Sequence, residues 1–125
     1  MVYKYFVTFS LVVATLGFVF FALPDGNLHI ITCDVGQGDA ILITNKSNQI
    51  LIDGGPDNSV LTCLGKYMPF WDRKIEMVIL THPQSDHFTG LIEVFRRYQV
   101  DVYLANAVDN LGNEGYQVLK KEVGS

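Results

Sequence analysis

The stretch Ile79–His87, with the sequence ILTHPQSDH, is the strongest local signal in this chain. It completes an apolar run, Lys74–Leu80, whose solid apolar end is typical of a strand covered on both faces. Two of the three histidines in the chain, His82 and His87, then follow together with Asp86. Imidazole and carboxylate are both good zinc ligands, and a loop at a strand end lets such side chains converge. The stretch therefore predicts the start of a metal site that activates water for hydrolysis, with ordinary loop residues as the alternative.

The segments on either side predict a mixed α/β domain, in which helices cover a sheet. Strands rich in β-branched residues are expected at 28–34, 40–44, 49–53, 74–80 and 100–105. The polar turn Asn45–Asn48 joins the second and third strands, so the first three strands form an antiparallel meander. Helices are expected from Ser59, as the cap, to Tyr67, and from Thr89 to Arg97. After residue 108 the chain turns polar, so the last strand–helix unit looks unfinished.

A long uncharged run, Phe6–Leu23, occupies the N-terminus. A bilayer core needs about 20 apolar residues, so we expect a single membrane anchor over residues 1–24 and a globular part over residues 28–125. A cleaved signal peptide and a buried core helix are the alternatives. Lys4 precedes the run, which favours an N-terminus inside the cell. The chain is therefore expected in the cell membrane, with its globular part outside the cytoplasm.

The net charge of −4 argues against a broad surface for nucleic acid, which is usually strongly basic. It leaves room for a phosphodiester substrate, because a bound metal can supply positive charge locally. Cys33 and Cys63 allow one disulfide outside the cytoplasm, but two buried thiols are at least as well supported. His29 lies inside the first strand, where a core or edge role is expected.

Acidic residues also adjoin two glycine turns, one after the first strand and one after the third. The residues concerned are Asp34, Gly36, Gly38, Asp39, Asp53, Gly54 and Gly55. Such acids often satisfy backbone amides in turns. The glycines alternatively permit a close bend that places Asp39 toward the cluster at the end of the 74–80 strand.

Three segments together resemble the metallo-β-lactamase superfamily: DVGQGDA at 34–40, LIDGG at 51–55 and ILTHPQSDH at 79–87. More narrowly, they resemble the C-terminal hydrolase domain of ComEC-type competence proteins, which belong to a DNA-uptake channel. The resemblance runs from about residue 28 to residue 105. It implies an αββα sandwich, a zinc-activated hydroxide and cleavage of DNA. The nitrogen and oxygen ligands themselves leave manganese as the alternative metal. A membrane helix beside the domain fits the same resemblance.

The resemblance also assigns roles to individual residues. His82, Asp86 and His87 match metal ligands, and Asp86 is the one expected to take part in catalysis as well. Gln84 stands where most members have a histidine and where the ComEC branch often has an aspartate. Because Gln is neutral and coordinates weakly, it weakens one of the two metal positions. Asp53 matches a structural acid that is expected to hydrogen-bond the loop.

The superfamily draws its later ligands, a histidine, a bridging aspartate and a final histidine, from the second half of the sandwich. No histidine follows His87 in this chain. The chain therefore resembles the N-terminal half of such a domain. A truncated or degenerate, non-catalytic module is the alternative to a hydrolase.

Overall fold

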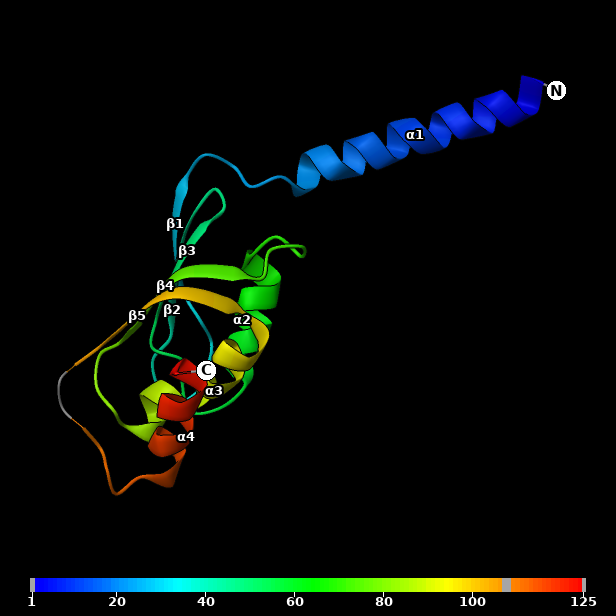
Figure 1. The fold of residues 1–125 in the computed structure, drawn as a ribbon. Helices are drawn as coiled ribbons and strands as arrows, with labels where there is room; N and C mark the ends of the chain where they lie inside the picture. Colours follow the sequence, from blue (N-terminus) through cyan, green and yellow to red (C-terminus); the bar gives the residue numbers. More distant parts are fainter. Residues whose placement is uncertain (1, 107–108, 125) are drawn as a thin grey trace.

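A computed structural model describes residues 2–106 and 109–124. Its elements are an N-terminal helix and a mixed α/β domain, as the sequence predicts (Figure 1). The helices are α1 (Val2–Ala22), α2 (Ser59–Tyr67), α3 (Ser85–Arg97) and α4 (Glu114–Val123). The strands are β1 (Leu28–Thr32), β2 (Ile41–Asn45), β3 (Asn48–Ile52), β4 (Lys74–Leu80) and β5 (Gln99–Ala105).

The five strands form one sheet in the order β1-β2-β3-β4-β5. β1, β2 and β3 pair antiparallel, whereas β3, β4 and β5 pair parallel. The change follows from the connections, because a tight turn can join only antiparallel strands and parallel neighbours need a crossover. The turn between β2 and β3 is shorter than predicted, since Asn45 and Asn48 still pair across it. Lys46 occupies the left-handed region there, with φ of 56°.

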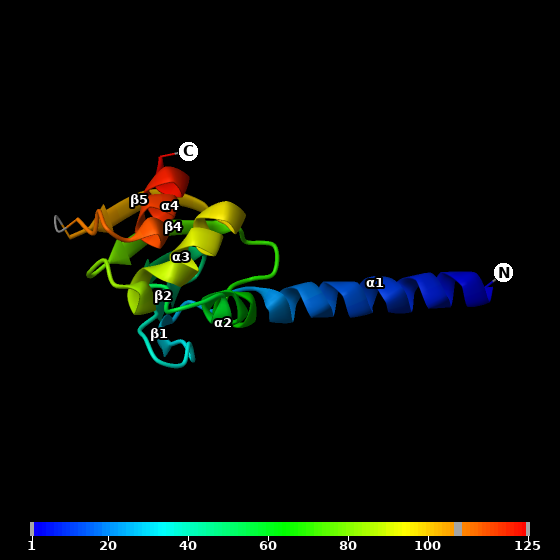
Figure 2. The ribbon, with the colours of Figure 1, turned by 90° about the horizontal axis from the view of Figure 1, so that it is seen from below.

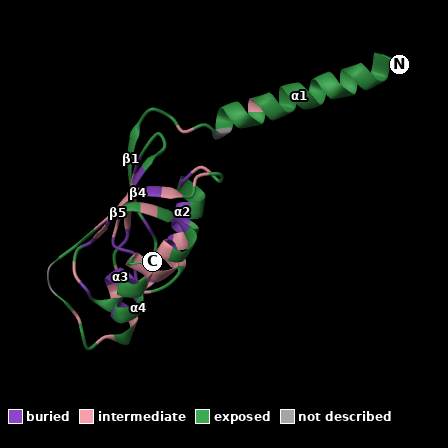
Figure 3. Ribbon diagram, in the orientation of Figure 1, coloured by how far each residue is buried: buried purple, intermediate pink, exposed green. Residues whose placement is uncertain are grey.

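Helices α2, α3 and α4 lie on one face of the sheet and enclose the core (Figures 1 and 3). The sheet contributes fully buried side chains such as Leu42, Leu51 and Val78. The helices contribute Val60, Leu64, Leu91, Val94 and Leu119 to the same cluster. Successive side chains of each strand point to opposite faces, so the sheet has one face covered by helices and a second face.

The second face of the sheet is apolar as well. The register aligns two rows of side chains across all five strands. The first row consists of Ile30, Ile43, Ile50, Met77 and Val102. The second row consists of Thr32, Ile41, Ile52, Ile79 and Leu104. Ile30, Val102 and Leu104 are exposed, and the other apolar members of the two rows are only half-buried. Among the described residues, nothing therefore covers this face as the helices cover the other.

Three helices differ from the sequence prediction. Helix α3 begins at Ser85, before the predicted Thr89, so the segment expected to be a loop is partly the first turn of a helix. Helix α4 was not expected. It begins after Asn113, whose side chain accepts a hydrogen bond from the backbone N–H of Tyr116 at 3.1 Å. The cap of α2 is Asn58, one residue before the predicted Ser59.

Helix α1 is long and apolar enough to cross a membrane, judged by length and composition. The span Val2–Phe21 has a mean hydropathy of 1.8. None of this span is buried within the structure, so α1 is not packed as a core helix of the domain. A membrane anchor and a signal sequence share these properties.

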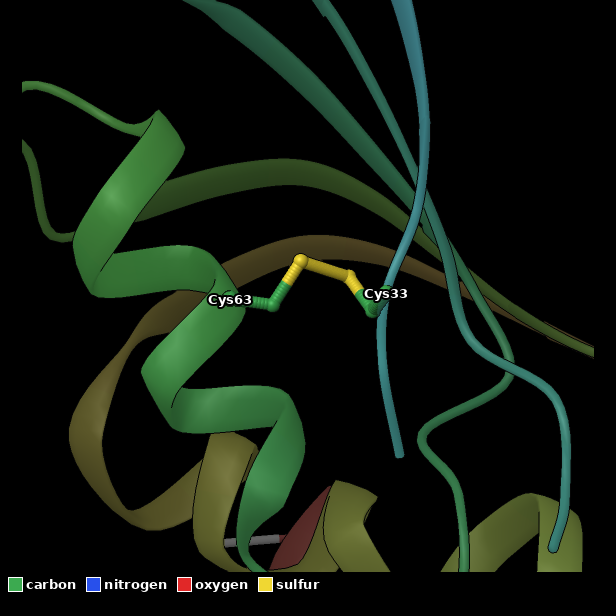
Figure 4. Close-up of a disulfide and its surroundings, with 2 residues drawn as sticks. All are labelled: Cys33 and Cys63. Atoms are coloured by element: carbon green, nitrogen blue, oxygen red, sulfur yellow. A yellow bond between two sulfur atoms is a disulfide. The ribbon is translucent and has the colours of Figure 1, made fainter. Parts of the chain in front are cut away.

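A disulfide joins Cys33, in the segment after β1, to Cys63 of α2 (Figure 4). The alternative of two buried thiols is therefore not what the structure contains. The bridge fastens the edge of the sheet to the helical layer, where both cysteines are buried.

Candidate active site

The chemically interesting residues meet where β3 and β4 end. Because these strands are parallel, the segments that follow them leave the sheet at the same edge. Asp53 follows β3, and His82 follows β4. The early start of α3 places Asp86 and His87 in the first helical turn, next to both.

Asp53 is the buried centre of this group, with 3 % of its surface exposed. Its carboxylate accepts hydrogen bonds from the backbone N–H of Thr81 at 2.8 Å and from the Thr81 hydroxyl at 2.6 Å. It also lies 2.9 Å from Nδ1 of His87, which donates to it when that nitrogen carries the proton. On β5, burial, together with the charges of Tyr116 and Asp53, raises the pKa of Tyr103 to about 12.

The bond to Asp53 fixes the ring of His87 and leaves Nε2 for other partners. Nε2 of His87 lies 3.7 Å from a carboxylate oxygen of Asp86. The rings of His82 and His87 lie against one another, with centroids 3.8 Å apart. Nδ1 of His82 lies 3.0 Å from the Thr81 hydroxyl. The structure thus brings together His82, Asp86 and His87, the three residues that the sequence singled out.

The glycine turns hold the start of α3 in place. The N–H of Gly54 donates to the carbonyl of His87 at 2.6 Å, and the N–H of Asp39 lies 3.4 Å from the carbonyl oxygen of Asp86. A Cβ atom on Gly38 would collide with that same Asp86 oxygen. Close backbone approach, which only glycine permits, therefore explains this position.

Gly36 and Gly55 adopt φ values of 73° and 72°, in the left-handed region that favours glycine. The N–H of Gly55 donates to the carbonyl of Asp39 at 2.9 Å, which ties the two turns together. The exposed Asp39 carboxylate lies 3.9 Å from Nδ1 of His87. Asp34, by contrast, lines a hollow beside α2 that Lys66 also lines, and so belongs to another part of the surface.

Sequence reasoning missed two residues of this site. Thr81 connects Asp53 to His82, and its place inside the ILTHPQSDH stretch was the signal that could have identified it. Asn110 donates a hydrogen bond from Nδ2 to the carbonyl of Pro83 at 2.8 Å. Asn110 also lines a hollow of about 270 Å³ beside the cluster, together with His82 and the exposed Gln84.

Two glycine turns, His82 and the start of α3 thus surround the buried Asp53. The family model described as the metallo-beta-lactamase superfamily matches residues 33–124. The chain belongs to this superfamily. The matched region includes α4 and therefore extends beyond the predicted resemblance, while α1 lies outside it. No curated protein matches the chain.

Members of the metallo-beta-lactamase superfamily usually bind metals, but the side chains of the described residues do not fit a metal ion by themselves. Within residues 2–106 and 109–124, no three His, Cys, Asp or Glu side chains are arranged to hold one. His87 already uses Nδ1 for Asp53, and Asp86 lies beside His87. The described residues therefore do not form a metal site by themselves, and the assignment of His82, Asp86 and His87 as zinc or manganese ligands stays a prediction.

Replacing Asp53 by Asn should destabilise the candidate site, because the amide has the shape of the carboxylate but lacks its charge. We expect Asp53→Asn to lower the free energy of unfolding by about 2 kcal/mol, because hydrogen bonds to a charged group each contribute about 1.5–3 kcal/mol and the amide keeps some of them. Urea unfolding followed by circular dichroism measures the loss. Thr81→Val, which removes only the hydrogen bond from the Thr81 hydroxyl to Asp53, should lower the free energy of unfolding by less. Equal stability of Asp53→Asn and the natural chain would contradict a central role for Asp53.

Proposed function

We propose that this chain is a membrane-anchored part of a metal-dependent hydrolase of the ComEC type, which cleaves DNA phosphodiester bonds during DNA uptake. The observation that carries the proposal is the convergence of His82, Asp86 and His87 at the end of β4. The buried Asp53 supports it, because a carboxylate behind a ligating histidine usually sets the tautomer and orientation of the ring. Superfamily membership makes hydrolysis the reaction type to test first.

The proposal needs metal ligands beyond those of the described residues. A second layer of structure packed on the apolar second face of the sheet could carry these ligands. Exposed apolar patches of this kind mark surfaces to which another layer or partner binds. Two sheets packed face to face would complete the αββα sandwich of the superfamily. We infer that the layer covering this face brings the missing histidine and aspartate ligands to His82, Asp86 and His87.

Two features support a location at the outer side of the cell membrane. The Cys33–Cys63 disulfide is of a kind that persists outside the reducing cytoplasm. The apolar helix α1 carries a single positive charge near its start, Lys4, which favours an N-terminus inside the cell. The expected partners are accordingly the membrane, DNA and a DNA-uptake channel.

A second function is favoured by a different observation. By the superfamily resemblance, Gln84 stands where most members have a metal-binding histidine, and its neutral amide coordinates a metal weakly. This difference favours a non-catalytic module that keeps the fold of the superfamily and serves in assembly. In that case the apolar sheet face would bind a partner without completing a metal site.

Zinc titration of the full chain in detergent micelles separates the two functions. Under the hydrolase proposal, isothermal titration calorimetry should show weak zinc binding that His82→Ala/His87→Ala abolishes. Mutation of a residue that only hydrogen-bonds a metal ligand typically lowers metal affinity by about 10–100-fold. Loss of two ligands should therefore lower the affinity by more than that. His29→Ala is the matched control, because His29 is exposed and bonded to Asp25 at 2.7 Å, away from the cluster.

Each result bears on one function. Zinc binding that is equally weak in the double variant and in His29→Ala would contradict the hydrolase proposal and favour the assembly module. Gln84→His should tighten zinc binding if Gln84 occupies a ligand position. Zinc-dependent cleavage of a fluorescent oligonucleotide by the isolated chain would contradict the need for outside ligands.

A further inference from the structure

The turn between α2 and β4 exposes two large aromatic side chains. The turn, Pro69–Asp72, is closed by a hydrogen bond from the N–H of Asp72 to the carbonyl of Pro69 at 2.9 Å. Phe70 is 70 % exposed and Trp71 is 47 % exposed. Aromatic residues of this size are usually highly buried, so two neighbours left in solvent require an explanation. We call residues Pro69–Asp72 the aromatic turn.

The rings of the aromatic turn are held in a defined arrangement. The Phe70 and Trp71 centroids lie 4.8 Å apart, with their planes at 83°, an edge-to-face contact. Neither residue belongs to the hydrophobic core that α2, α3 and α4 form on the sheet. The pair is therefore an ordered apolar surface that does not support the packing of the domain.

The aromatic turn lies beside the C-terminal end of α1 (Figures 1 and 2). Phe70 and Trp71 line one hollow of about 300 Å³ together with Phe18, Val19 and Leu23. All five lining residues are apolar. The apolar surface of the turn is thus continuous with the apolar surface of the helix that is proposed to span the membrane.

We propose that the aromatic turn is a second membrane contact, which inserts Phe70 and Trp71 into the interfacial region of the bilayer from which α1 emerges. Tryptophan is enriched at that depth, because its ring is apolar and its N–H can remain hydrated. The continuity with α1 selects lipid as the occupant, since the same environment must surround both parts of one apolar surface. The inference rests on the proposed membrane placement of α1.

This contact would fix how the domain faces the membrane. The aromatic turn precedes β4, whereas His82 follows it. A strand of 7 residues, at about 3.3 Å per residue, spans about 20 Å. The candidate site would therefore be held away from the bilayer surface, open to a partner or substrate that arrives from the aqueous side.

Fluorescence tests the proposal directly, because Trp71 is the single tryptophan of the chain. The full chain is placed in phosphatidylcholine nanodiscs, with and without lipids brominated close to the headgroup. We expect blue-shifted Trp71 emission, a loss of that emission on brominated lipid, and protection from acrylamide. A separate variant, Trp71→Phe with Phe9→Trp, moves the reporter into α1 and tests the membrane anchor by itself.

The outcomes distinguish the two proposals. Quenching of the relocated tryptophan in that variant, together with unquenched and acrylamide-accessible Trp71 in the natural chain, would overturn the second contact and leave the anchor intact. Quenching of neither reporter would overturn both. Trp71 protected from acrylamide but not quenched by brominated lipid would show a protein neighbour, and would also overturn the lipid contact.

A pair of surface variants provides the matched comparison. Phe70→Ser removes half of the aromatic pair, and we expect it to shift Trp71 emission to longer wavelength in nanodiscs and to weaken the lipid quenching. Leu111→Ser is the control, because Leu111 is similarly exposed but lies in the segment before α4. An equal response to both substitutions would overturn the proposal.

Discussion

Removal of the Cys33–Cys63 disulfide is expected to lower the free energy of unfolding by about 3–4 kcal/mol. The bridge closes a loop with a sequence separation of 30 residues, and in the chain-entropy account such a loop restricts the unfolded chain substantially. It joins the segment after β1, an edge strand, to α2 on the helical layer. Loss of the bridge should therefore release β1 from the core first.

Urea unfolding of the full chain in detergent, followed by circular dichroism, measures this loss. Cys33→Ser/Cys63→Ser is compared with the natural chain, each with and without dithiothreitol. The reductant should destabilise the natural chain to the level of the double variant and leave the variant unchanged. A midpoint that neither the substitutions nor the reductant moves would contradict a stabilising role for the bridge.

Substitution of Gly90 by Ala is expected to cost about 3 kcal/mol, at the upper end of the usual range for overpacking. Gly90 lies in α3 where the helix crosses the loop after β3, and its N–H donates to the carbonyl of Gly55 at 3.1 Å. A Cβ atom there would meet the carbonyl oxygen of Asp57 at 2.5 Å and collide with that of Gly54. Because both obstacles are backbone atoms, the helix itself would have to move.

Gly65→Ala is the matched control for this prediction. Gly65 is also helical, in α2, but is exposed and has nothing within 4 Å of an added Cβ. Alanine should stabilise that position by up to about 1 kcal/mol, from helix propensity alone. Thermal unfolding of the two variants should therefore give shifts of opposite sign. A stabilised Gly90→Ala protein would show that α3 has more room than the structure allows.

The Gly90 substitution should also reach the candidate site. His87 precedes Gly90 by about one helical turn. A displaced α3 should therefore weaken the hydrogen bond between Nδ1 of His87 and the Asp53 carboxylate, which is 2.9 Å long. Histidine ring signals in an NMR spectrum report this change. The signals of His29, which lies on β1, should stay in place.

The helix starts show where local sequence reasoning was insufficient. Polar residues dominate the segment Pro83–His87, so apolar periodicity did not extend the predicted helix back to Ser85. The Thr89 hydroxyl bonds the carbonyl of Ser85 at 2.7 Å, as a residue inside a helix does. The acidic Asp86 in the first turn also suits the positive end of a helix.

Helix α4 was missed for a related reason. It buries Tyr116 and Leu119, and the ring of Tyr116 packs edge-on against Phe88 of α3 at 5.5 Å. A short helix draws most of its stability from such packing, and its own sequence signals are weak. Asn113, as an N-cap, was the one local signal that could have indicated where α4 begins.

The sequence alone determined the features that depend on neighbours along the chain: the apolar helix α1, the alternation of strands and helices, and the family to which the ILTHPQSDH stretch points. The tertiary structure decided which distant residues meet. Asp53 bonds Thr81 and His87 across 28 and 34 residues, and Cys33 bonds Cys63 across 30. Composition and periodicity act between near neighbours in the chain, whereas these pairs form only after the sheet and helices have packed.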